Sequence, residues 1–164
     1  MNFTIKAISL RKVIKLLISC AIPLAVGLLA QYFSGGTEIY STIIKPPFSP
    51  PPIVFPIVWT ILYILMGIAA FIVYNKGFVK YNVRDALKFY AMQLAVNFLW
   101  PIVFFRFEMY LVAFFVLLLL WILVGITTAK FYRISHSAGI IMLPYWLWTT
   151  FAAYLNFGIW FLNR

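Results

Sequence analysis

Acidic, catalytic and metal-binding side chains are scarce in this sequence of 164 residues. Asp and Glu together occur three times, histidine once and cysteine once, and only 10% of the residues are charged. A metal site needs several His, Cys or carboxylate ligands close together, whereas Glu38, Asp85 and Glu108 are far apart along the chain. No glycine-rich phosphate-binding motif occurs. We therefore expect no metal site and no nucleotide-binding fold, and the single Cys20 excludes an intrachain disulfide.

Apolar side chains are abundant instead. Hydrophobic residues make up 65% of the chain and aromatic residues 20%, and the mean hydropathy is +1.02. A soluble domain has about 25% charged residues, and it could not keep this much apolar surface out of water. A membrane-spanning helix needs about 20 apolar residues, so the chain has room for about five such helices joined by short loops. The sequence therefore predicts a single all-α membrane domain, a bundle of five transmembrane helices.

Five apolar segments predict the positions of these helices. Their expected ranges are 13–33, 53–74, 86–105, 109–131 and 138–162. Only residues 106–108 separate the third segment from the fourth, so these two helices should be antiparallel neighbours. The first segment follows basic residues, as a cleaved signal peptide would, but its apolar run continues well past Cys20. That continuation favours a helix that is retained in the mature protein.

The net charge of +10 comes from cations that lie between the apolar segments, so we expect membrane anchoring and no binding to nucleic acid. In an alternating five-helix topology, ten of the cations fall on the side of the amino terminus. Only Lys45, Arg106 and Arg164 fall on the other side. The positive-inside rule then places the amino terminus in the cytoplasm and the carboxyl terminus outside.

A few polar and aromatic side chains interrupt the apolar segments. They are Trp59 and Tyr63 in the second segment, Gln93, Asn97 and Trp100 in the third, and Trp148 and Asn156 in the fifth. A spacing of four residues places Gln93 and Asn97 on one helix face. Buried amides in a membrane serve either as hydrogen-bonded links between helices or as ligand contacts, and the sequence leaves both readings open. The available chemistry, aromatic stacking with a few hydrogen bonds, suits a flat and largely apolar ligand.

The segment 34–52 is long for a loop in so small a bundle. It begins with Gly35 and Gly36, which make a flexible entry, and it ends in a proline-rich stretch, residues 46–52, that resists helix and sheet. Long loops with stiff and flexible parts often close over ligands. The segment is therefore either a lid over a binding site or a rigid connector that sets the helix spacing.

Three motifs occur in order along the chain. They are residues 45–51 (KPPFSPP) with 55–63 (FPIVWTILY), residues 91–100 (AMQLAVNFLW) and residues 144–156 (PYWLWTTFAAYLN). Together with the five predicted helices they resemble the TspO/MBR family, which comprises tryptophan-rich sensory proteins and the mitochondrial translocator protein. The resemblance implies a five-helix bundle, often a homodimer, and here a protein of a bacterial cell membrane.

The resemblance also implies a pocket for protoporphyrin IX, other tetrapyrroles and drug-like hydrophobic molecules of the benzodiazepine type, with no obligatory cofactor. By match to the family motifs its lining would be Tyr40, Phe48, Trp59, Tyr63, Asn97, Trp100, Trp148, Ala152 and Leu155. A sterol contact would use Leu155, Phe161 and Arg164, with Phe161 where the sterol pattern expects tyrosine.

The function expected from this resemblance is a membrane receptor or sensor for porphyrins. Two alternatives remain: a light-dependent porphyrin-degrading enzyme, for which Trp59 and Trp148 would be the catalytic candidates, and a transporter of porphyrins or other lipophiles.

Overall fold

Seven helical elements form the described part of the chain, and five of them are long. The computed structural model describes residues 10–36 and 38–164. The elements are α1 (Leu10–Ser34), α2 (Ile39–Thr42), α3 (Val54–Tyr74), α4 (Tyr81–Pro101), the π-helix η1 (Ile102–Arg106), α5 (Tyr110–Ile134) and α6 (His136–Leu162). Helices α1, α3, α5 and α6, and α4 together with η1, are each long and apolar enough to cross a membrane. The predicted all-α class with five transmembrane helices is confirmed.

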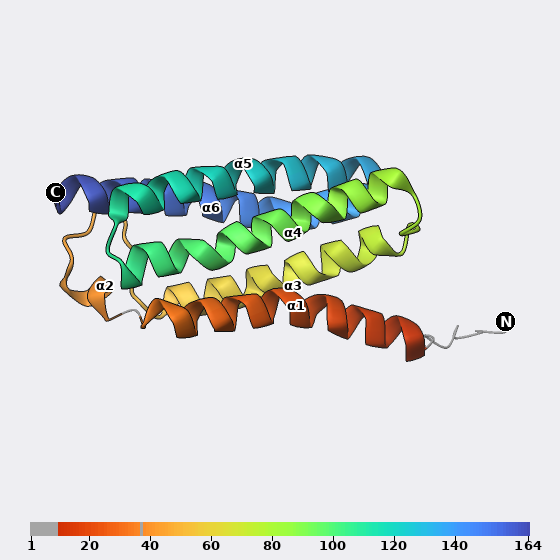
Figure 1. Ribbon diagram of the computed structural model, residues 1–164, viewed down its shortest axis with the longest axis horizontal. Helices are drawn as coiled ribbons and strands as arrows, with labels where there is room; N and C mark the ends of the chain where they lie inside the picture. Colours follow the sequence, from red (N-terminus) through yellow and green to blue (C-terminus); the bar gives the residue numbers. More distant parts are fainter. Residues whose placement is uncertain (1–9, 37) are drawn as a thin grey trace, which may run out of the picture.

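The five long helices run side by side, and the two ends of the bundle differ (Figure 1). One end holds the start of α1, the α3–α4 loop and the α5–α6 turn. The other end holds α2, the turn after η1 and the carboxyl terminus. Among the described residues, nine Lys and Arg lie toward the first end, whereas Lys45, Arg106 and Arg164 lie at the second. The uneven charge expected from the sequence is therefore a property of the folded bundle.

Helices α3 to α6 enclose the core, and α1 lies on its outer edge. The largest of the described side chains that are less than 2% exposed all come from these four helices, for example Met66, Leu117, Phe131 and Tyr145. In α1, by contrast, only Pro23, Ala30 and Ser34 are buried. Helix α1 packs against α3, α4 and η1, and its opposite face is left for lipid.

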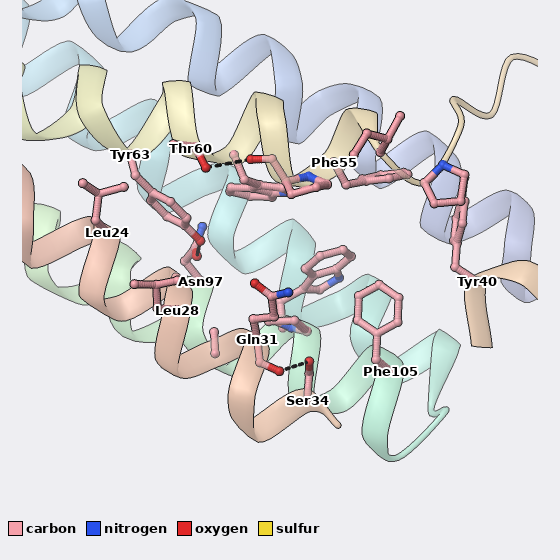
Figure 2. Close-up of a pocket in the computed structure, with 18 residues that line it drawn as sticks. Leu24, Leu28, Gln31, Ser34, Tyr40, Phe55, Thr60, Tyr63, Asn97 and Phe105 are labelled. Carbon is pink, nitrogen blue, oxygen red and sulfur yellow. Dashed lines mark hydrogen bonds between the residues drawn. The ribbon is translucent and has the colours of Figure 1, made fainter. Parts of the chain in front are cut away.

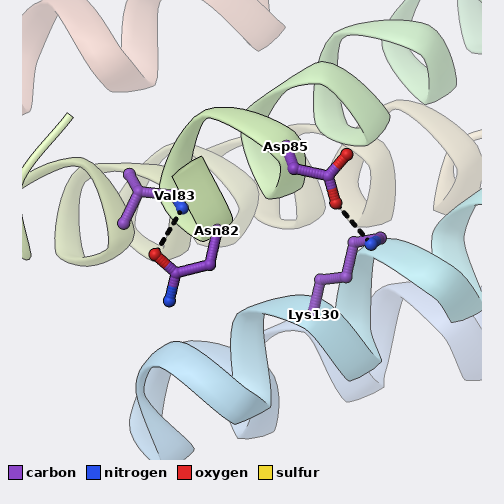
Figure 3. A network of polar contacts seen from close by, with 4 residues as sticks. All are labelled: Asn82, Val83, Asp85 and Lys130. Carbon is purple, nitrogen blue, oxygen red and sulfur yellow. Dashed lines mark hydrogen bonds and ion pairs between the residues drawn. The ribbon is translucent and has the colours of Figure 1, made fainter. Parts of the chain in front are cut away.

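An ion pair joins α4 to α5 near the cation-rich end (Figure 3). The Lys130 ammonium lies 2.5 Å from the Asp85 carboxylate, and it also lies over the ring of Phe89, 4.8 Å from the ring centre. Both charged side chains are about 30% exposed, so the pair keeps some solvation and does not carry the full penalty of a buried charge. It fixes α4 against α5 where the two helices leave the apolar core.

A close backbone contact joins α1 to α3 in the half of the bundle nearer the cation-rich end. The Ser19 hydroxyl donates to the Gly67 carbonyl over 2.8 Å, and a Cβ at position 67 would collide with the backbone of Cys20. Glycine is therefore the residue that allows this approach. At the other end of α1, the Arg106 guanidinium donates to the Phe33 carbonyl over 3.2 Å. Helix α1 is thus attached to α3 at one end and to η1 at the other.

The loop before α3 is fastened to α6. The Asn163 amide accepts a hydrogen bond from the Ile44 N–H and donates to the Ile44 carbonyl, over 3.0 and 2.8 Å. The Tyr154 hydroxyl donates to the Pro47 carbonyl over 3.0 Å, and Pro46 packs directly on Gly158. The lid predicted for residues 34–52 would have to break these contacts in order to open.

Candidate functional site

A cavity of about 510 Å³ lies between α1, α3 and α4, in the half of the bundle that faces α2 (Figure 2). Helix α1 forms one side of it and α3 the other, and α4 and η1 form the back. Its lining residues are Leu24, Gly27, Leu28, Ala30, Gln31, Ser34, Tyr40, Pro52, Ile53, Phe55, Pro56, Trp59, Thr60, Tyr63, Asn97, Trp100, Pro101 and Phe105. Most of this surface is apolar, which favours an apolar ligand.

Aromatic rings make up the inner wall of the cavity. The indole of Trp59 lies with its ring centre 5.6 Å from Tyr63, 6.4 Å from Trp100 and 6.1 Å from Tyr145. The planes of Tyr63 and Trp100 are each inclined by 31° to the plane of Trp59. Neighbouring rings with tilts of this size give an aromatic surface on which a flat conjugated molecule can stack.

A chain of hydrogen bonds runs from this wall into the core. The Tyr63 hydroxyl donates to the Asn97 side-chain oxygen over 2.8 Å, and the Asn97 amide donates to the Tyr145 hydroxyl over 2.9 Å. The Tyr145 hydroxyl in turn donates to the Gln93 carbonyl oxygen over 2.8 Å, and the Gln93 amide reaches the sulfur of Met66. Because each buried polar group has a partner, the rings that carry them are held in fixed positions.

A second buried amide holds Trp100 in place. The Trp100 indole N–H donates to the Asn156 side-chain oxygen over 2.9 Å, and the Asn156 amide donates to the Tyr110 carbonyl over 2.8 Å. This interaction links α4, α5 and α6 behind the cavity. Of the amides that the sequence left open, Gln93 and Asn156 connect helices in the core, and Asn97 both connects helices and lines the cavity.

The outer rim of the cavity is more polar than its wall. The Ser34 hydroxyl donates to the Gln31 carbonyl over 2.8 Å, and the Gln31 side chain is exposed at the rim. Tyr40 closes the end of the cavity, with its ring centre 5.0 Å from that of Phe55 and 4.8 Å from the Lys45 ammonium. Burial raises the pKa of the Tyr40 phenol, which therefore stays neutral and donates a long hydrogen bond, 3.4 Å, to the Pro50 carbonyl.

Comparison with known proteins identifies the family. The sequence profile of the TspO/MBR family matches residues 19–161. The tryptophan-rich protein TspO of Chlorobaculum tepidum is 36% identical over 155 residues, which are 93% of this chain and 98% of the relative. The chain belongs to the TspO/MBR family. The tryptophan-rich sensory protein of Cereibacter sphaeroides is 37% identical over 90% of this chain and 88% of its own. The human translocator protein is 34% identical over 76% of this chain and 75% of its own.

Five of the nine residues that the TspO/MBR motifs suggested as pocket lining border the cavity. They are Tyr40, Trp59, Tyr63, Asn97 and Trp100. Tyr40 comes from α2, whereas α3 and α4 each contribute two of these residues. The two residues on each long helix are three or four positions apart, so they lie on the same face of that helix. The TspO/MBR motifs of the second and third transmembrane helices thus meet across a single cavity.

The other four suggested residues lie outside this cavity. The side chain of Phe48 is 89% exposed and its backbone adopts a φ of 63°, an unusual conformation for a bulky residue. Trp148 packs against Phe55, with 6.1 Å between ring centres, so it lies behind a lining residue. Its indole N–H is buried and has no hydrogen-bond partner among the described residues. Ala152 and Leu155 are buried within the bundle.

The three residues of the suggested sterol contact are not on one surface. Leu155 is buried, whereas Phe161 is exposed near the carboxyl terminus with the Arg164 guanidinium 4.3 Å from its ring centre. Phe161 and Arg164 therefore form a small exposed pair of their own. The described residues contain no group of three His, Cys, Asp or Glu that could hold a metal ion.

Sequence reasoning missed the contribution of α1 to the site. Six lining residues come from this helix, and they include Gln31 and Gly27. Gln31 is a large polar residue in the last turn of an apolar segment, four residues after Gly27. This pattern could have indicated that the face of the first helix with Gly27 and Gln31 lines a site. Phe55, Thr60 and Phe105 were also missed, because aromatic residues and threonine are common in any transmembrane helix.

Proposed function

We propose that this protein is a membrane receptor or sensor that binds porphyrins and related flat, hydrophobic molecules in the cavity between α1, α3 and α4. One observation carries the proposal: the rings of Trp59, Tyr63 and Trp100 line the cavity, and the planes of Tyr63 and Trp100 are each tilted by only 31° from the plane of Trp59. A tetrapyrrole is a planar aromatic system and gains stacking energy on such rings. The volume of about 510 Å³ is within the range of sites for drug-sized ligands.

Membership of the TspO/MBR family supports the same proposal. The relative from Cereibacter sphaeroides is named a sensory protein, and the human relative is named a translocator protein. Both names are consistent with a protein that recognises a small molecule in the membrane. The apolar wall with few hydrogen-bonding groups also explains how drug-like molecules of the benzodiazepine type would bind without a charged partner.

A titration with protoporphyrin IX tests the proposal. The protein is placed in lipid nanodiscs, and quenching of tryptophan fluorescence is measured against porphyrin concentration. Trp59→Ala removes the ring that contacts the other aromatic residues of the wall, and it should weaken binding by about 1–3 kcal/mol. Trp121→Ala is the matched control, because Trp121 stacks on Trp146 at the contact between α5 and α6, away from the cavity. Equal affinity of the two variants would refute the proposed site.

Light-dependent porphyrin breakdown is the second candidate function. The observation that favours it is the position of Trp59, which borders the cavity and lies within 6.4 Å of three further oxidisable rings. Loss of the porphyrin absorption band under illumination, dependent on the protein and reduced in Trp59→Phe, would support the enzyme. Binding without such loss would support the receptor. Porphyrin flux into proteoliposomes would instead support a transporter.

The proposal includes an orientation and an assembly. We infer that the protein lies in a bacterial cell membrane with the cation-rich end in the cytoplasm and the carboxyl terminus outside.

We also infer a homodimer through the lipid-facing side of α4, where Ala91 and Ala95 are exposed and a shallow apolar groove runs beside Val26. Small residues allow close helix contact in a membrane. A single species of monomer mass in nanodiscs and in mild detergent would contradict the dimer.

A further inference from the structure

The cavity has an opening on the side of the bundle. Several of its lining residues are themselves strongly exposed, and they lie on two facing edges. Leu28 of α1 is 69% exposed, and Ile53, just before α3, is 65% exposed. Gln31, Pro56 and Thr60 are also exposed and continue the same two edges. The cavity therefore opens between α1 and α3, as their positions on opposite sides of it in Figure 2 show.

The attachment of α1 explains why this gap exists. Toward the cation-rich end, α1 is tied to α3 through the contact between Ser19 and Gly67. Toward the other end it is tied to η1 and α4, through the Arg106 hydrogen bond to Phe33 and the contact between the rings of Phe33 and Phe98. Helix α1 stays in contact with α3 as far as Gly27, where a Cβ would collide with the Tyr63 ring, and beyond this point it joins η1. The gap forms where α1 has left α3.

The gap lies within the apolar lengths of both helices. Leu28 precedes the end of α1 by six residues, and Thr60 follows the start of α3 by six residues, which corresponds to about 9 Å along each helix. Both helices are long and apolar enough to cross the membrane. We therefore expect the edges of the gap to face lipid.

The proline-rich loop is not positioned to close this gap. Residues 44–47 are held on α6 by the Asn163 amide, the Tyr154 hydroxyl and the contact of Pro46 with Gly158. Of the residues that follow in the loop, Pro52 and Ile53 reach the cavity, at its α3 edge. Opening the loop would break several hydrogen bonds, whereas the gap between α1 and α3 needs no such change.

We propose that the gap between α1 and α3 is a lateral portal through which a ligand dissolved in the bilayer enters the cavity. Leu28, Ile53 and Pro56 present apolar edges to lipid, so a flat lipophile can pass between them without being hydrated. Gln31 and Thr60 supply polar groups at the same edges, where the polar substituent of an amphipathic ligand can be held. The ligand class is a planar, membrane-soluble molecule with one polar edge. The portal adds a route of ligand entry to the proposed function. It rests on that function only in the choice of protoporphyrin IX as the probe.

Obstruction of the portal by a single side chain provides the test. Leu28→Trp places a large ring at the edge of the gap, and Leu29→Trp is the matched control because Leu29 is 51% exposed to lipid but does not line the cavity. The entry and release of protoporphyrin IX are followed by stopped-flow fluorescence between nanodiscs. Leu28→Trp should slow both rates about tenfold, equivalent to a barrier of about 1.4 kcal/mol, whereas Leu29→Trp should leave them unchanged.

A disulfide that fixes the proline-rich loop to α6 tests whether the ligand instead enters beneath this loop. In a Cys20→Ala background, Pro46→Cys and Gly158→Cys can be joined, because the Pro46 Cβ lies 2.6 Å from where a Cβ at position 158 would stand. A disulfide prefers about 3.8 Å between Cβ atoms, so a shift of about 1 Å would suffice. The oxidised and reduced forms should exchange porphyrin at the same rate. A rate that falls on oxidation and recovers on reduction would assign entry to the loop and overturn the portal.

A third measurement needs no porphyrin. A thiol is placed on the inner wall by Trp59→Cys in the Cys20→Ala background, and its reaction with the lipid-soluble reagent N-cyclohexylmaleimide is timed. Added Leu28→Trp should slow the reaction about tenfold and added Leu29→Trp should not, again a barrier of about 1.4 kcal/mol. This pattern would support the portal even if protoporphyrin IX failed to bind, in which case the proposed function alone would be wrong. Equal rates with the two tryptophans, or no reaction in the parent variant, would contradict the portal.

Discussion

At the scale of single residues, Tyr145 is the centre of the buried polar chain. Its hydroxyl accepts a hydrogen bond from Asn97 and donates one to Gln93, and the residue is completely buried. Tyr145→Phe removes both bonds and leaves the Asn97 side-chain N–H and the Gln93 side-chain oxygen without these partners, so it should destabilise the fold by about 1–3 kcal/mol. Tyr63→Phe removes one bond and should cost about 0.6 kcal/mol. Reversible unfolding in mixed micelles measures both, and a smaller loss for Tyr145→Phe than for Tyr63→Phe would contradict this ranking.

Trp148 and Trp59 should differ in their effects on binding. Trp59 borders the cavity, whereas Trp148 acts on it through the ring of Phe55. Trp148→Ala should therefore weaken porphyrin binding less than Trp59→Ala, which we expect to cost about 1–3 kcal/mol. Affinities from fluorescence titration decide the order. A larger loss for Trp148→Ala would mean that the ligand displaces Phe55 and reaches the unpaired indole N–H of Trp148.

Spacing in the sequence predicted which residues share a face but not which partners they meet. Gln93 and Asn97 are four residues apart and do lie on one face, yet only Asn97 borders the cavity. Gln93 is buried away from the cavity because the hydroxyl of Tyr145, on α6, donates a hydrogen bond to its side-chain oxygen. A contact between residues 52 positions apart has no local signal in a single sequence.

At the scale of helices, the contact between α1 and α3 depends on Gly67. A Cβ at this position would meet backbone atoms of Cys20, which cannot rotate away. Gly67→Ala should therefore destabilise the protein by about 1–3 kcal/mol, as overpacking does. Gly125→Ala is the comparison, since a Cβ there first meets the Trp146 side chain at 3.2 Å, and a side chain can adjust. Unfolding in micelles should rank Gly67→Ala as the more damaging change, and the reverse order would refute the packing account.

The loops and helix ends were harder to anticipate than the helices. The run of prolines correctly indicated that residues 46–52 avoid helix, because proline lacks the N–H donor. Its fastening to α6 depends on Asn163, more than a hundred positions away. The π-helix η1 follows Pro101, and nothing in the local pattern separated it from a continuing α-helix. Apolar length thus predicts where a helix crosses the membrane, whereas tertiary contacts decide how it ends.

At the scale of the whole molecule, the charge difference between the two ends predicts the orientation. The α3–α4 loop, with Lys76 and Lys80, lies at the cation-rich end, and Arg164 lies at the other (Figure 1). Alkaline phosphatase fused after Arg164 should be active because the enzyme folds only outside the cytoplasm, and the same enzyme inserted at Gly77 should be inactive. The reverse pattern would show that the cation-rich end is exported.

The fold class could be predicted from composition because each transmembrane helix must satisfy its own backbone hydrogen bonds in lipid. The cavity could be predicted only in part. The TspO/MBR motifs indicated its α3 and α4 walls, but its α1 wall depends on the departure of α1 from α3, which is set by contacts at Gly67 and Arg106. These contacts join segments far apart in the sequence.

The central claim is that a flat ligand binds against Trp59 and Trp100, between α1, α3 and α4. A crystal structure of the protein with protoporphyrin IX tests this claim most directly. We expect density for the macrocycle in the cavity, stacked on the indole of Trp59 and with its polar edge toward Gln31. Density for the porphyrin at another surface, with the cavity between α1 and α3 unchanged, would show that the ligand does not bind in this cavity.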